Sequence, residues 1–345
     1  MRILPTLILI TVLLTTVACD KQPEKGELIV VSGLTMGTVY NIKIVTVDDT
    51  LNRELINREI EKVFNETNRS MSTYDEDSEL SSINRSKDSE NIPLSQGLYS
   101  VLDLALEICK FTNGAFDVTI GPLVNLWGFG PVKKSEVIPD QNEIRRLLDR
   151  TGCEKLELGH DRGYIRKLHP DIYIDLSGIA KGYGVDKIAE YLESLQIQNY
   201  LVEVGGEIRA RGINEKGRKW RIGIEKPVTL ERRIQKIVQL DDTGMATSGD
   251  YRNYFEVEGV RYSHTIDPST GSPVAHNLVS VTVLDPSAAR ADALATALLV
   301  MGPDKGYRFA QESNISAYFI EKVNNVFEEK YTDPFADCLT EKQDR

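Results

Sequence analysis

The fold class is decided by the stretch IYIDLSGIAKGYGVDKIAEYLESLQIQNYLVEVGGEIRAR, residues 172–211. Residues 172–176 are predicted as a strand, and 180–195 carry apolar side chains at helical spacing. Residues 200–211 then read as two strands joined by Gly205-Gly206, a pair typical of a tight hairpin turn. Strands and helices are therefore mixed without a strict strand–helix–strand repeat. This pattern favours an α+β fold with mixed or antiparallel sheets over a doubly wound sheet.

The same mixture continues on both sides of this stretch. Strands are predicted over 39–47, 219–225, 234–240, 254–257 and 278–284, and helices over 51–65, 97–111, 140–150 and 287–301. The polar residues 70–89 read as a loop, and residues 116–131 as a glycine-broken aromatic segment. No internal repeat interrupts this order.

Length and charge narrow the class of protein. The chain has 345 residues, 41% of them hydrophobic, which is enough for one large two-lobed domain or two smaller ones. Its formal net charge of −11 argues against a nucleic acid as partner, because a phosphate backbone is bound by basic surfaces.

The N-terminus has the features of an export signal. Arg2 is followed by an apolar run, residues 3–17, and then by Ala18-Cys19-Asp20. A Cys after a small residue resembles a bacterial lipobox, although Thr16 stands where Leu is usual. An ordinary cleaved signal or an uncleaved anchor is the alternative.

From this pattern we expect a signal peptide over 1–18, a tether lipidated at Cys19 over 19–29, a domain over 30–338 and a polar tail over 339–345. Asp20 resembles the retention signal of inner-membrane lipoproteins. The expected location is therefore the inner membrane, with the domain on the periplasmic side.

The cysteines outside the lipobox do not form a recognisable framework. Cys109, Cys153 and Cys338 show no metal spacing, and at most one bridge among them is possible. Cys109 falls on the apolar face of a helix, so a core thiol is the prediction, without a disulfide. His160, His169 and His276 have no spacing that supports a zinc site.

A helix near the C-terminus carries an unusual pair of polar residues. The segment ADALATALLVMG, residues 291–302, is apolar apart from Asp292 and Thr296, which lie four apart and so share a face. A buried carboxylate is costly unless it is paired or bound to a metal, and Mg²⁺ takes oxygen ligands of this kind. The alternative is a structural carboxylate near a helix N-terminus.

Two further motifs could carry chemistry. Residues 175–186, DLSGIAKGYGVD, place glycines and Lys181 at a strand end that opens a helix, where free N–H groups suit phosphate oxygens. A generic helix entry explains the same residues. His264 stands beside the turn of residues 267–271 and is either a general base or a structural histidine.

Six motifs in order resemble one family over about residues 30–320. They are TMGTVYNI from Thr35, STYDEDSELSSIN from Ser72, GAFDVTIGPLVNLWGFGP from Gly114, IDLSGIAKGYGVD from Ile174, LVEVGGEIRARG from Leu201, and the segments 247–271 and 291–302. The chain resembles the ApbE-type flavin transferases, FAD:protein FMN transferases with a T-fold-like two-lobed α+β domain.

The resemblance implies a Mg²⁺-dependent reaction on FAD that links FMN to a Thr or Ser hydroxyl of a target protein and releases AMP. It implies that His264 is the base and that the metal is held by Asp292, Thr296 and the carbonyl of Gly178. The residues that it implies for the FAD site are Met36, Tyr74, Ala115, Phe116, Asp117, Asp175, Lys181 and Ile266.

Two other functions stay open at this point. A hydrolase of the same fold would use water and yield FMN and AMP, and a non-enzymatic lipoprotein would only bind FAD. The resemblance further suggests acceptor subunits of membrane redox complexes, such as the sodium-pumping NADH:quinone reductase (Nqr) or the Rnf complex.

Overall fold

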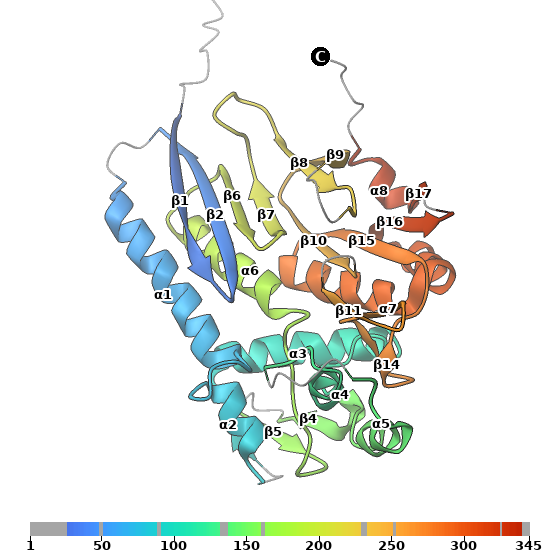
Figure 1. Ribbon diagram of the computed structural model, residues 1–345. Helices are drawn as coiled ribbons and strands as arrows, with labels where there is room; N and C mark the ends of the chain where they lie inside the picture. The colour runs from blue at the N-terminus through green and yellow to red at the C-terminus, as the bar shows by residue number, and fades with distance from the viewer. Residues whose placement is uncertain are drawn as a thin grey trace, which may run out of the picture.

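The computed structural model describes residues 26–47, 51–87, 91–131, 137–159, 163–228, 233–250, 253–324 and 326–339. Their arrangement is α+β, with a large sheet and its helices above a smaller, mainly helical lobe, as the sequence predicts (Figure 1). The predicted signal peptide, Cys19 and the tail from residue 340 lie outside the described residues. No helix within the described ranges has both the length and the hydrophobicity needed to span a bilayer.

The main sheet has eight strands, and every neighbouring pair in it is antiparallel. In sheet order the strands are β1 (Glu27–Thr35), β2 (Thr38–Thr46), β6 (Tyr200–Val204), β7 (Glu207–Arg211), β10 (Thr243–Gly249), β15 (Leu278–Asp285), β16 (Ser316–Val323) and β17 (Val326–Tyr331). The first strand begins inside the stretch that the sequence assigns to the tether.

The helices are α1 (Arg53–Met71), α2 (Glu79–Arg85), α3 (Gln96–Phe111), α4 (Gly121–Leu126), α5 (Gln141–Leu148), α6 (Ala180–Ser194), α7 (Ala288–Glu312) and α8 (Asp333–Ala336), with a 3₁₀ turn η1 (Cys153–Lys155). The smaller sheets are β3 (Ile92–Pro93), β5 (Tyr164–Lys167) and β4 (Leu156–Leu158); β8 (Trp220–Glu225) with β9 (Ile234–Leu240); β11 (Tyr254–Val257) with β12 (Val260–Ser263); and β13 (Ile266–Asp267) with β14 (Ser272–Pro273).

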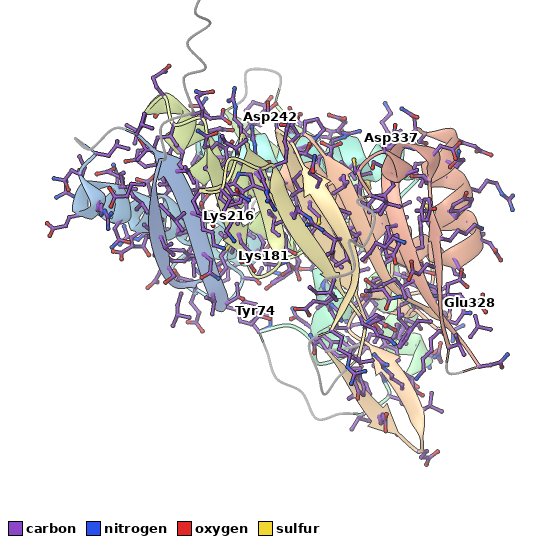
Figure 2. The ribbon with its side chains drawn as sticks, turned by 90° about the horizontal axis from the view of Figure 1, so that it is seen from above. Tyr74, Lys181, Lys216, Asp242, Glu328 and Asp337 are labelled. Atoms are coloured by element: carbon purple, nitrogen blue, oxygen red, sulfur yellow. A yellow bond between two sulfur atoms is a disulfide. The ribbon has the colours of Figure 1, made fainter. Side chains whose placement is uncertain are left out.

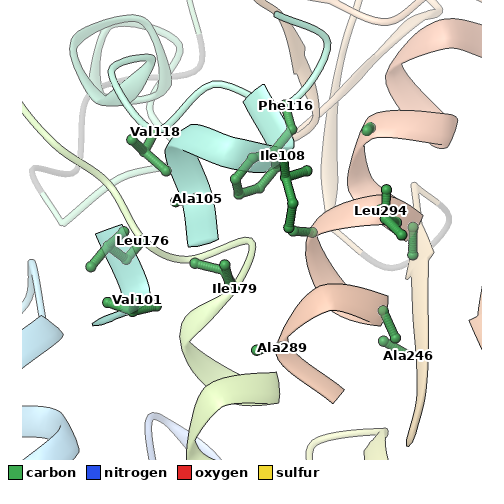
Figure 3. Close-up of a cluster of buried hydrophobic side chains, with 14 of the residues drawn as sticks. Val101, Ala105, Ile108, Phe116, Val118, Leu176, Ile179, Ala246, Ala289 and Leu294 are labelled. Carbon is green, nitrogen blue, oxygen red and sulfur yellow. The ribbon is translucent and has the colours of Figure 1, made fainter. Parts of the chain in front are cut away.

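Both faces of the main sheet are covered, which is why its central strands are almost wholly apolar. Strand β15 is buried at seven of its eight positions. On one face α1, α6 and α7 pack against the sheet, and on the other β8, β9 and α8 do. The core under α7 continues into the lower lobe, where Ile108 of α3, Phe116 and Leu294 of α7 gather (Figure 3).

Helices α6 and α7 pack closely against each other at their N-terminal ends. A Cβ on Gly182 would lie 2.3 Å from the carbonyl oxygen of Ala288, so only glycine allows this approach. The buried Asp186 carboxylate accepts the backbone N–H groups of Ala288 and Ala289, each at 3.0 Å, and so caps α7 from α6. The first turns of the two helices are therefore fixed relative to each other.

Two local predictions are wrong. The predicted loop 70–89 contains α2, which starts because the Ser78 side chain accepts the N–H of Ser81. The predicted strand 172–176 joins no sheet, because its backbone is satisfied elsewhere. The amide of Asn84 bonds both the N–H of Ile174, at 2.7 Å, and its carbonyl, at 2.8 Å.

Candidate functional site

A cavity of about 390 Å³ opens where the lower lobe meets the first turns of α6 and the middle of α7. It is lined by all but one of the site residues expected from the sequence: Tyr74, Ala115, Phe116, Asp117, Asp175, Gly178, Lys181, His264, Ile266, Asp292 and Thr296. Tyr74 and Lys181 lie on the same side of the molecule in the view from above (Figure 2). Segments more than two hundred residues apart in sequence, such as those of Tyr74 and Thr296, thus meet at one place.

Met36 is the expected site residue that is not in the lining of this cavity. It occupies the two-residue turn between β1 and β2 with a φ of 48°, and Gly37 follows with a φ of 71°. Its side chain packs toward Gly184, where an added Cβ would lie 2.8 Å from the Met36 Cε. A contact between Met36 and FAD stays a prediction.

Asp292 is a deeply buried carboxylate, with only 3% of its surface exposed. Helix α7 is capped by Ser287 and begins at Ala288, so Asp292 lies beyond the first turn, where the helix dipole stabilises charge little. Its Oδ2 accepts the backbone N–H of Gly182 at 3.2 Å. Burial raises the pKa of Asp292, while Lys181 and that N–H act in the opposite direction. An apolar helix thus carries a carboxylate that has few partners of its own.

Lys181 forms its ion pair with Glu207, a residue that the sequence analysis did not single out. The Lys181 Nζ lies 2.6 Å from Oε1 of Glu207, and the Glu207 side chain is 3% exposed. Burial raises the pKa of Glu207 to about 7, against the attraction of Lys181. Burial also disfavours the Lys181 charge, but Asp292 and Glu207 together raise the Lys181 pKa. The sequence feature that could have identified Glu207 is its position directly after the Gly205-Gly206 turn.

The hydroxyl of Thr296 lies next to the loop that opens α6. A Cβ on Gly178 would lie 3.5 Å from the Thr296 Oγ1, and Ser248 Oγ is 3.0 Å from the same oxygen. Ser248, on β10, is a second lining residue that the sequence analysis left unassigned. Gly178, Thr296 and Asp292 all line the cavity. Their backbone carbonyl, hydroxyl and carboxylate groups are the oxygen donors that Mg²⁺ prefers.

The charge of the lining also suits a cation. Asp117, Asp175, Glu207 and Asp292 face the cavity, against a single lysine. Within the described ranges, no group of three or more His, Cys, Asp or Glu side chains could hold a metal. A metal here would therefore depend on one carboxylate with hydroxyl and backbone oxygens. This is the donor set that the family resemblance implies.

His264 directly follows β12 and is part of the cavity lining. Its Nδ1 is 3.1 Å from the carbonyl oxygen of Asn253, and its backbone N–H donates to the same oxygen. Because a carbonyl can only accept, Nδ1 carries the proton and Nε2 keeps its lone pair. Burial lowers the pKa of His264, and Lys181 and Arg261 lower it further, against the Asn253 contact. The imidazole is neutral near pH 7 and can accept a proton.

The rest of the lining combines flat apolar side chains with well-held carboxylates. Phe116 is buried, whereas Tyr74 is 68% exposed at the mouth. Asp117 accepts the Thr119 N–H and hydroxyl, at 2.8 and 2.7 Å, and burial raises its pKa. Asp175 accepts the N–H and hydroxyl of Ser177. The hydrogen bonds from Thr119 and Ser177 therefore fix the orientation of the two carboxylates, and neither contact involves a positive charge.

Cys109 and Cys153 form a disulfide, so the prediction of a free core thiol is wrong. The bridge joins the last turn of α3 to η1 across 44 residues of sequence. Cys153 also provides a backbone hydrogen bond to Asp117, which links the bridge to the cavity wall. Periodicity indicated the burial of Cys109 but could not show that Cys153 folds back onto it. Cys338 is a free cysteine.

Comparison with known proteins places this chain among flavin transferases. The model of the ApbE family matches residues 36–319. The chain is 45% identical to the FAD:protein FMN transferase of Vibrio cholerae over 334 residues, which cover 97% of this chain and 98% of the relative. It is 38% identical to that of Escherichia coli K12, with 95% of each chain covered.

Solved structures agree with these sequence matches. The flavin transferase ApbE from Vibrio cholerae superposes with a TM-score of 0.85 at 44% identity, covering 91% of this chain and all of that one. The apo form of the flavinyl transferase ApbE from Pseudomonas stutzeri gives a TM-score of 0.84 at 37% identity, covering 92% and 98%.

Proposed function

The chain belongs to the ApbE family, and we propose that it is an FAD:protein FMN transferase whose reaction takes place in the cavity where the lower lobe meets α6 and α7. The acceptor hydroxyl oxygen forms a bond to the phosphorus of the FMN moiety. The pyrophosphate P–O bond of FAD breaks, AMP leaves, and the hydroxyl proton passes to the enzyme. The product is an FMN phosphoester on a Thr or Ser of the acceptor protein.

The observation that carries this proposal is the convergence of Asp292, Thr296, Lys181 and His264 on one cavity. Phosphoryl transfer depends mainly on positioning and on neutralising negative charge. The pyrophosphate of FAD would enter a lining that is already rich in carboxylates, so it needs a cation besides Lys181. A Mg²⁺ ion held by Asp292, Thr296 and the Gly178 carbonyl would supply that charge.

His264 would receive the proton of the acceptor hydroxyl. Its Nδ1–H is held by the Asn253 carbonyl, which leaves Nε2 as the proton acceptor. The isoalloxazine ring is flat and largely apolar, and Tyr74 and Phe116 offer it aromatic surface. Lys181 lies in the same lining and carries the positive charge that suits the phosphates.

We also propose that the protein is a lipoprotein of the inner membrane, anchored at Cys19 with its domain in the periplasm. The sequence pattern of residues 2–20 supports this location. The Cys109–Cys153 disulfide supports it independently, because structural disulfides persist in oxidising compartments. The proposed acceptors are periplasmic domains of Nqr- or Rnf-type redox complexes.

The test is a reaction of the protein with FAD, Mg²⁺ and a purified acceptor domain, followed by denaturing electrophoresis and in-gel flavin fluorescence. A fluorescent acceptor band that requires Mg²⁺ supports the transferase. Release of FMN and AMP at the same rate with or without acceptor, and no labelled band, would indicate an FAD hydrolase instead. Bound FAD that stays intact would indicate a storage protein.

A further inference from the structure

Lys181 stands between two buried carboxylates and pairs with only one of them. The Lys181 Nζ lies 2.6 Å from Oε1 of Glu207, whereas Asp292 accepts a hydrogen bond from the Gly182 N–H. Asp292 nevertheless attracts Lys181, because its charge raises the lysine pKa, as the charge of Glu207 does. The lysine therefore has two competing partners within one cavity.

The backbones that carry the three groups leave little room for adjustment. The close approach of Gly182 to Ala288 fixes the start of α6 against α7, and with it the positions of Lys181 and Asp292. Glu207 is fixed by the β6–β7 hairpin, where Gly205 and Gly206 have φ values of 62° and 110°. Only the lysine side chain, with its four rotatable methylene groups, can choose between the carboxylates.

We infer that Glu207 is a positioning residue that holds Lys181 away from Asp292. Asp292 then stays free for a divalent cation, so this inference rests on the metal site of the proposed function. With Glu207 neutral, Asp292 is the other carboxylate that attracts Lys181. A Lys181–Asp292 ion pair would occupy the only charged donor of the metal site and place a positive charge beside it.

A second feature of Glu207 is that its environment is unfavourable for a carboxylate. Its Oε2 is buried and has no hydrogen-bond partner among the described residues. Burying a carboxylate that is only half satisfied costs free energy. A residue that merely filled the space below Lys181 would be less costly as a neutral side chain. A carboxylate retained for its ion pair with Lys181 would carry this cost.

The experiment measures Mn²⁺ affinity by titration calorimetry in the absence of FAD, so that catalysis plays no part. For Glu207→Gln we expect affinity to fall about 10- to 100-fold, the usual effect of losing a partner outside the metal's own ligands. Lys181→Met removes the competitor, so the double variant should bind Mn²⁺ as tightly as Lys181→Met alone. Glu203→Gln, on the neighbouring strand β6 and outside the cavity lining, is the matched control.

Each of the following results would overturn the inference. Glu207→Gln with the affinity of the wild type would show that the charge is irrelevant. A double variant as weak as Glu207→Gln would show that Glu207 binds the cation itself or supports the fold, and thermal unfolding of each variant separates these two. If Asp292→Asn binds Mn²⁺ like the wild type, the metal site itself is wrong. Loss of Mn²⁺ in Asp292→Asn with none in Glu207→Gln overturns the role of Glu207 alone.

Discussion

Replacing His264 by alanine should slow FMN transfer while leaving FAD binding largely intact. The Asn253 carbonyl fixes the tautomer, and burial keeps the imidazole neutral, so the wild-type side chain is ready to accept a proton at pH 7. Loss of a general base costs about 10²- to 10⁴-fold in rate. That corresponds to roughly 3–6 kcal/mol in the activation free energy, at about 1.4 kcal/mol per tenfold.

The pH profile gives a second measure of the same role. Because the pKa of His264 lies below its ordinary value of 6.5, the wild-type rate should be flat above that pH and fall only at lower pH, as the imidazole gains a proton. The acid limb should disappear in His264→Ala. Single-turnover transfer from FAD-saturated enzyme, followed by acceptor fluorescence from pH 5 to 8, measures both effects.

FAD affinity, measured by flavin fluorescence, separates the possible roles of this residue. A collapse in affinity with an unchanged single-turnover rate would make His264 a substrate ligand, and the base would have to be another group. No change in either quantity would make it a structural histidine. His169→Ala, which lies outside the cavity lining, should behave as the wild type in both assays.

Four other expectations follow from the sequence and the structure. Asp292→Asn should lose Mg²⁺-dependent transfer yet keep its melting temperature, since the neutral amide suits a buried position; activity that ignores a chelator would refute the metal assignment. The pKa of Glu207 in the folded protein, about 7, lies above its ordinary value of 4.5. The contribution of Glu207 to the free energy of unfolding is therefore present below pH 4.5 and is lost as the pH rises through 7. Chemical denaturation of the metal-free protein at several pH values should show this loss, and the loss should be smaller in Glu207→Gln. Replacing both Cys109 and Cys153 by alanine should lower the free energy of unfolding by about 2–4 kcal/mol, and an unchanged denaturation midpoint would contradict this. Cys19→Ser should abolish acylation and membrane attachment, and a wild-type protein without acyl chains in mass spectrometry would disprove the anchor.

The sequence predicts most of the local structure because local structure depends on nearby residues. Alternation and helical spacing identified the β6–β7 hairpin, α6 and the first part of α7, up to its kink at Gly302. Prediction was wrong for residues 172–176, where the Asn84 side chain bonds the backbone of Ile174 and the Val118 carbonyl accepts the N–H of Asp175, in place of a neighbouring strand. The local sequence pattern does not show whether such a segment bonds to a neighbouring strand or to other distant groups.

The candidate site likewise has features that the sequence predicts and features that depend on tertiary contacts. Residue type and spacing made Asp292, Thr296, Lys181 and His264 candidates with alternative readings, and the family resemblance predicted their roles. That these residues meet in one cavity, that Glu207 completes the ion pair, and that Cys153 reaches Cys109 are facts of packing. They depend on which strands and helices become neighbours, and contacts between residues far apart in the chain leave no periodic signal within either segment. The sequence thus determined the chemistry available to this protein, and the tertiary structure alone decided which charges face one another.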